Sequence, residues 1–338
     1  MRRFSIADFR LRIEGPAVFI VALALGILAA PLAADAQPPS KVPRIGVLES
    51  SPSSESVEAF KQGLRDRGYV EGKSIVFEYR WAQGKVAEFP KLAAELVRLT
   101  VDVIFAGTTP AALAARDATN TIPIVFAMVA DPVGVQLISS LPRPGGNVTG
   151  LTTSNIEVNG KRLEILKAIS GGKVSRGAML FNPADASNVL SLRAIEDPAR
   201  ILGMTLRPFP VKGPEDFEGA FSAMASERIE SLFVAAGVLT ITHARRIAEL
   251  AARTRVPAIY GAREFVDAGG LVSYSASFTD NYRRAATYVD KILKGAMPRD
   301  LPVEQASTFE LVINRKTAAA LGLTLSPSML LQATQVID

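Results

Sequence analysis

Polar side chains stand where predicted strands end and the next helix begins, which is where open α/β proteins hold small ligands. The following helix N-terminus adds free N–H groups and a positive dipole end, both suited to a carboxylate. The same residue types are ordinary helix caps, so each position taken singly also has a purely structural explanation. The set consists of Ser50 and Ser51 after 44–49, Thr108 and Thr109 after 101–107, Asp131 after 122–129, Asn182 at the end of 177–182, and Tyr260 at the end of 256–260.

The composition excludes much catalytic and metal chemistry. The 338 residues include no Cys and one His, which excludes disulfides, thiolate metal sites, thiol nucleophiles and multi-histidine sites. That residue, His243, is followed by two Arg and has no acid within four positions, so a role as general base is disfavoured. Residues 68–74 resemble a phosphate-binding loop, but they are one residue short and precede a strand. We expect no cofactor, no metal and no catalytic residue.

The elements that position these side chains alternate between short strands and amphipathic helices. Apolar, β-branched and aromatic runs recur from residue 44 onward, separated by segments of helical period such as Val57, Phe60 and Leu64. This βαβα order predicts an α/β fold with parallel sheets covered on both faces. Residues 101–126 and 230–260 share the order strand, Gly, helix, strand, which indicates two similar doubly wound lobes. The turn cluster 141–147 and a late strand-like run at 308–313 suggest that the chain crosses between the lobes more than once.

The N-terminus has the pattern of an export signal. Four Arg precede an apolar run at 17–30, and Ala34 and Ala36 fit the small-x-small rule for cleavage after Ala36. A membrane anchor is the alternative, but the run is shorter than the roughly 20 residues that span a bilayer. We therefore expect residues 1–36 to be a signal peptide.

Several segments together resemble the substrate-binding proteins of ABC transporters of the tryptophan/tyrosine type. They are EYRWAQG (78–84), AGTTPAALAA (106–115), IPIVFAMVADPVG (122–134), LPRPGGNVTGLT (141–152), LFNP (180–183), VPAIYGAREFVDAGGLVSY (256–274) and DLPVEQASTFELVINRKTAAALGL (300–323). The resemblance implies a type I periplasmic-binding fold, in which two α/β lobes joined by three crossing strands trap a ligand. On this basis lobe one comprises 43–150 and 276–306, and lobe two comprises 151–275 and 307–338.

The same resemblance implies a periplasmic receptor that delivers a small carboxylate ligand to the membrane permease of an ABC importer. An aromatic or branched amino acid, or a related organic acid, is the expected class. A sensor that presents its ligand to a membrane receptor is the alternative, and an enzyme on the same fold is disfavoured. The 38 Lys and Arg and 33 Asp and Glu are interspersed, so no nucleic-acid partner is expected, and we expect a monomer.

Two further positions complete the predicted ligand-binding set. Trp81, the sole indole, could stack on an aromatic ring or pack at the lobe edge, and Glu264 lies within the resembling segment 256–274. One departure bears on the ligand, because many relatives carry an acid just after the strand near 231–235, where this chain has Ala235-Ala236-Gly237-Val238. If that acid holds an amine in the relatives, this chain is expected to prefer a ligand without one.

Overall fold

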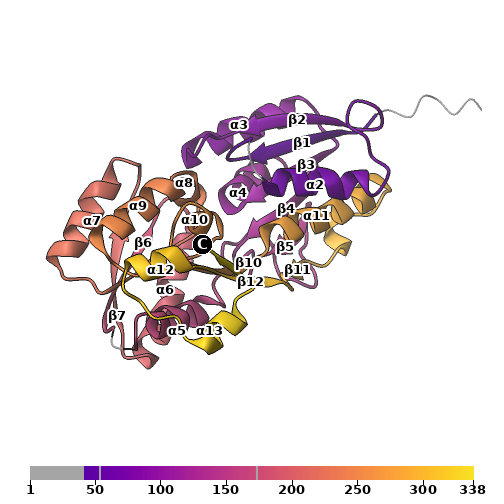
Figure 1. Ribbon diagram of the computed structural model, residues 1–338. Helices are drawn as coiled ribbons and strands as arrows, with labels where there is room; N and C mark the ends of the chain where they lie inside the picture. Colours follow the sequence, from indigo (N-terminus) through magenta and orange to yellow (C-terminus); the bar gives the residue numbers. More distant parts are fainter. Residues whose placement is uncertain (1–41, 53–54, 173) are drawn as a thin grey trace, which may run out of the picture. The chain divides into compact units, whose positions relative to one another are not determined.

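The computed structural model describes residues 42–52, 55–172 and 174–338, and these residues build two β-sheets with helices on both faces of each (Figure 1). The predicted signal peptide and its cleavage site lie outside the described residues. The α/β class with mainly parallel sheets is confirmed. Among the helices that the structure describes, none combines the length and apolarity needed to cross a membrane.

The first sheet is parallel throughout, with the strand order β11-β5-β4-β3-β1-β2. Its strands are β1 (Arg44–Glu49), β2 (Val76–Trp81), β3 (Val103–Thr108), β4 (Ile124–Val129), β5 (Val148–Thr152) and β11 (Glu304–Gln305). Helices α2 (Glu55–Arg65) and α11 (Phe278–Leu293) cover one face through Phe60 and Val289. Helices α3 (Phe89–Arg98) and α4 (Thr109–Ala118) cover the other face through Leu96 and Ala112.

The second sheet has the order β13-β12-β10-β9-β8-β6-β7. Its strands are β6 (Arg176–Phe181), β7 (Thr205–Pro210), β8 (Ser231–Val234), β9 (Ala258–Tyr260), β10 (Val272–Ala276), β12 (Phe309–Asn314) and β13 (Gln335–Ile337). One face packs on α7 (Asp216–Ser226), α9 (Ala244–Thr254) and α10 (Glu264–Asp267). The other packs on α5 (Asn159–Ile169), α6 (Ala186–Ile201), α12 (Arg315–Ala320) and α13 (Pro327–Gln332). A short helix, α8 (Val238–Thr242), follows β8.

Within the described residues the chain passes between the sheets three times. It leaves the first sheet after β5, returns through α11 and β11, and then enters β12 of the second sheet. One pairing differs from the parallel prediction, because β12 runs antiparallel to β10. The end of β10 and the start of β12 meet at the crossing, where Ala276 pairs with Phe309, so the two strands run in opposite directions.

Candidate functional site

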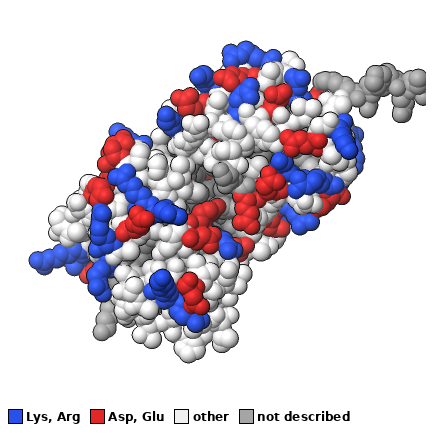
Figure 2. Space-filling model, turned by 45° about the horizontal axis from the view of Figure 1, so that its top comes forward, with Lys and Arg blue, Asp and Glu red and all other residues white. Residues whose placement is uncertain are grey.

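A cavity of about 490 Å³ collects side chains from both sheets and from the crossing helix α11. The strands of the first sheet contribute residues near their carboxyl ends, and the second sheet contributes residues that follow β8 and β9. In Figure 2 the surface is hollowed near its centre, and acidic side chains lie at the edge of the hollow. The residues used below are Glu49, Ser50, Ser51, Thr108, Thr109, Asn155, Asp185, Ser187, Arg263, Glu264, Asp267, Ser277, Phe278, Tyr282 and Glu310.

Helix N-termini converge on this cavity. Thr108 is the N-cap of α4, and its hydroxyl accepts a hydrogen bond from the backbone N–H of Ala111 at 3.4 Å. Ser277 is the N-cap of α11 but makes no side-chain capping bond. At α6 the cap is Asp185, which accepts from the backbone N–H of Ser187. These helix starts supply partial positive charge on the side where Thr108, Thr109 and Ser277 line the cavity.

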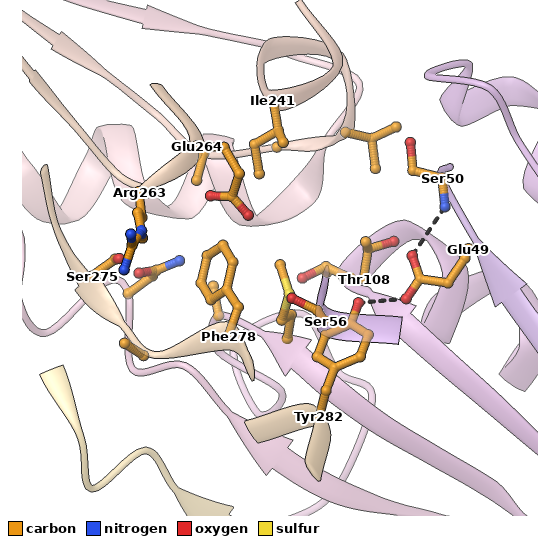
Figure 3. A pocket seen from close by; sticks show the side chains of 18 of the residues that line it. Glu49, Ser50, Ser56, Thr108, Ile241, Arg263, Glu264, Ser275, Phe278 and Tyr282 are labelled. Atoms are coloured by element: carbon orange, nitrogen blue, oxygen red, sulfur yellow. Dashed lines mark hydrogen bonds between the residues drawn. The ribbon is translucent and has the colours of Figure 1, made fainter. Parts of the chain in front are cut away.

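Glu49 is a buried carboxyl at the end of β1. Its side chain accepts the hydroxyl hydrogen of Tyr282 and the backbone N–H of Ser50, the latter at 3.0 Å (Figure 3). Burial raises its pKa to about 7. The pair fits because residue 107 is Gly: a Cβ there would lie 1.4 Å from Glu49 Oε1 and 2.2 Å from the Tyr282 hydroxyl. A glycine of β3 therefore holds open the space for this carboxyl.

Glu264 begins α10 and points its carboxylate toward the cavity from the side of the second sheet (Figure 3). Its Oε2 atom is buried and has no hydrogen-bond partner in the described part of the chain, and burial raises the pKa of the group. Its neighbour Arg263 faces two other acids, with Nε 3.1 Å from Asp267 Oδ2 and Nη1 3.9 Å from Glu310 Oε2. Arg263 is thus paired with two other acids, while Glu264 Oε2 has no hydrogen-bond donor among the described residues.

A fully buried guanidinium lies behind the wall of the cavity. Arg162 of α5 donates to the carbonyl oxygen of Tyr274 at 2.7 Å, to the Oδ1 of Asn159 at 2.9 Å, and to the Oδ1 of Asn155 at 2.7 Å. Desolvation lowers its pKa to about 9. Because Asn155 Oδ1 accepts from Arg162, its amide NH₂ is directed away from the guanidinium, and Asn155 lines the cavity.

Five of the nine predicted site residues line the cavity. They are Ser50, Ser51, Thr108, Thr109 and Glu264, and whether they contact a ligand stays a prediction. The other four are not among the lining residues and have local contacts instead. Two of them stack on rings: Trp81 on Tyr79 with ring centroids 5.3 Å apart, and the buried Tyr260 on Phe265 with centroids 4.8 Å apart. The other two accept hydrogen bonds from nearby backbone N–H groups, Asp131 from Gly134 at 2.8 Å and Asn182 from Ala184 at 3.0 Å.

Sequence reasoning missed several lining or supporting residues, among them Glu49, Asn155, Arg162, Phe278 and Tyr282. A signal existed for Glu49, since a charged residue follows the apolar interior IGVL at the end of the strand RIGVLE. None existed for Arg162, whose charge would place it on the solvated face of a helix. His243 lies outside the cavity lining and packs edge-on against Phe217. No group of three or more His, Asp or Glu in the described part of the chain could hold a metal.

Comparisons with a family model, a curated relative and solved structures agree with one another. The model of the family described as "ABC transporter substrate binding protein" matches residues 42–337. A tyrosine-binding protein of Clostridioides difficile is 27% identical over 280 residues, covering 82% of this chain and 80% of the relative.

Two solved structures are also similar. A conserved domain protein from Vibrio cholerae has a TM-score of 0.81 and 30% identity, and the match covers 88% of this chain and all of that one. An ABC domain from Streptococcus pneumonia in complex with L-Trp has a TM-score of 0.81 and 27% identity, with 87% and 99% of the two chains covered.

Proposed function

We propose, from the premise that this chain belongs to the family of ABC transporter substrate-binding proteins, that it is the solute receptor of an ABC importer. Its fold is the type I periplasmic-binding fold, as the resemblance implied. The proposed receptor works in the periplasm after cleavage behind Ala36 and passes its solute to a membrane permease. The two lobes proposed for it are 43–150 with 276–306, and 151–275 with 307–338.

The observation that carries the proposal is a cavity lined by residues of both sheets, most of them at or just after the ends of strands. Its volume of about 490 Å³ lies in the range typical of small-molecule sites. Hydroxyls at helix starts, such as Thr108, Thr109 and Ser277, offer donors for a carboxylate. Apolar side chains such as Met128, Ile241 and Phe278 offer contacts for a hydrocarbon or aromatic group.

The proposed ligand class is an aromatic or branched amino acid or a related organic acid. The C. difficile relative is named for tyrosine, and the streptococcal structure contains L-Trp. Both names support an aromatic amino acid as the first candidate for this chain.

A thermal-shift panel tests the proposal. Purified protein lacking residues 1–36 is mixed with each of the common amino acids and with aromatic acids such as benzoate. A ligand present at 1,000 times its Kd should stabilise the protein by about 4 kcal/mol. We expect a raised Tm with at least one aromatic or branched compound. No shift with any member of the panel would contradict the proposed ligand class.

A further inference from the structure

The cavity carries a surplus of negative charge. Among the described residues that line it, six are acidic and one is basic, Arg263; the acids are Glu49, Glu55, Asp185, Glu264, Asp267 and Glu310. A site that accepted only a carboxylate would be expected to offer a free cation for it. Here the lining cation already faces Asp267 and Glu310. The charge balance therefore favours a ligand with a positive group of its own.

Two of these acids already have donors. Glu49 accepts from Tyr282 and from the backbone of Ser50, and Asp185 accepts from the backbone and hydroxyl of Ser187 at 3.0 and 2.6 Å. These carboxyls are held by the protein and shape the cavity. Glu264 differs, since its buried Oε2 atom has no hydrogen-bond partner within residues 42–52, 55–172 and 174–338.

A buried polar oxygen without a hydrogen bond is costly, and most such atoms in folded proteins find a donor. Figure 3 shows the Glu264 carboxylate and the Phe278 ring facing the same space, opposite Thr108. An ammonium group placed there would donate to Oε2 and could also contact the face of an aromatic ring. The opposite side, at Thr108 and Thr109, would remain for a carboxylate.

We propose that Glu264 binds a positively charged nitrogen of the ligand, so that the receptor selects amino acids over carboxylic acids that lack an amine. This inference rests on the proposed function and narrows its ligand class. It also reverses the expectation drawn from the segment 235–238, because the acid absent there is replaced by one on α10.

A rival explanation is that Glu264 is protonated and donates its hydrogen to a ligand carboxylate. Glu264→Gln separates the two, because glutamine is neutral but keeps both an acceptor and a donor. If the carboxylate is the binding group, Gln weakens the binding of amines. If the protonated acid is the binding group, Gln preserves the affinity.

The test is calorimetric titration with matched pairs that differ only in the amine. The pairs are L-tryptophan with indole-3-propionate, L-tyrosine with 3-(4-hydroxyphenyl)propionate, and L-leucine with 4-methylpentanoate. For the pair that binds, wild type should prefer the amine by about 10- to 100-fold, the range of a charge-assisted hydrogen bond. Glu264→Gln should lower affinity for the amine by a similar factor and leave the amine-free partner within about threefold.

Glu196→Gln is the matched control. It removes the same charge by the same substitution at an exposed position of α6, outside the cavity lining. Its affinity for the amine should stay within about threefold of wild type. Equal falls in Glu264→Gln and Glu196→Gln would reduce the effect to general charge and overturn the direct contact.

The outcomes separate the inference from the proposed function. Equal binding of amine and amine-free partners, or unchanged affinity in Glu264→Gln, overturns the inference and leaves the receptor proposal standing. No binding of any of the six compounds overturns the inference, whereas the receptor proposal is contradicted only if no member of the thermal-shift panel binds. A Tm of Glu264→Gln equal to or above that of wild type confirms that the variant is folded, because the substitution removes charge from a group whose buried Oε2 atom has no hydrogen-bond partner among the described residues.

Discussion

At the scale of single residues, the cavity depends on acids whose positions are set by very small neighbours. Glu49 can line the cavity because Gly107 has no side chain to overlap its carboxyl. The backbone at this point belongs to a central strand with buried neighbours on both sides, so it has little room to move. The position of the Glu49 carboxyl therefore requires a glycine at residue 107.

Gly107→Ala should disrupt the Glu49–Tyr282 pair. The added methyl would overlap both oxygens, so we expect a loss of stability of about 1–3 kcal/mol, the usual range for overpacking, together with weaker ligand binding. Thermal unfolding and titration of the variant measure the two effects.

The control is Gly219→Ala. Gly219 lies inside α7, and a Cβ there meets nothing within 4 Å, so this substitution should be neutral or stabilising by up to about 1 kcal/mol. Equal melting temperatures for Gly107→Ala and wild type would contradict the crowding argument.

Glu49 should also make stability depend on pH. Its pKa is raised from 4.5 to about 7 by burial, so the folded protein binds its proton more tightly than the unfolded chain does. The free energy of unfolding should then fall as the pH rises from about 4.5 to 7, by up to about 3 kcal/mol, and level off above pH 7.

Glu49→Gln should remove this part of the pH dependence. The measurement is urea unfolding of wild type and variant at intervals between pH 4.5 and 8. The difference between their unfolding free energies should change across that window. Parallel curves would show that Glu49 titrates alike in the folded and unfolded states.

At the scale of elements, the strands were predictable and the site only in part. Continuous apolar runs such as 103–107 are typical of buried parallel strands. The structure places β3 at Val103–Thr108, within two residues of the predicted strand 101–107. The strands β11 (EQ) and β13 (QVI) were not predicted, because neither lies in an apolar run long enough to show a pattern, whereas the similarly short β9 lies in the apolar run 256–260. Ser50 and Thr108 reached the cavity because parallel strands deliver their ends to one edge of a sheet.

The lining residues of α11 were missed for a different reason. Phe278 and Tyr282 are one turn apart on α11, and an apolar helix face is normally a core face. Their place beside the cavity follows from the crossing of the chain back to the first sheet, which no local pattern encodes. Asp131 accepts a hydrogen bond from the backbone N–H of Gly134, as a cap would, and its contact with a ligand stays a prediction.

The start of α4 permits a test of the carboxylate side. Thr109 is buried at the first helical position and lines the cavity, so Thr109→Val, which keeps the volume, should reduce affinity for an amino acid by roughly tenfold. Thr108→Ala should in addition cost about 1 kcal/mol of stability, because it removes the cap. Calorimetry and thermal unfolding read the two effects separately.

The alternative is that both threonines act only on the helix. In that case Thr109→Val would bind the ligand as tightly as wild type, and only the melting temperatures would change.

At the scale of the whole molecule, the described residues form a site that no single sheet supplies. Thr108 and Glu49 come from strands of the first sheet, Glu264 comes from a helix that packs on the second, and Phe278 comes from the helix between them. A ligand that contacts both sides ties them together, which is how a receptor can favour one arrangement when it is loaded. Hydroxyls lie at one side, and at the other lies the Glu264 carboxylate, whose Oε2 atom has no hydrogen-bond partner among the described residues; this is the arrangement on which the proposed amino acid ligand rests.

A crystal structure of the protein grown with L-tryptophan, or with the amino acid that binds most tightly, tests this account most directly. The account predicts the ligand in the cavity, with its carboxylate within hydrogen-bond reach of Thr108 or Thr109 and its ammonium nitrogen within reach of Glu264 Oε2. A ligand bound outside the cavity, or one whose carboxylate faces Glu264, would contradict it.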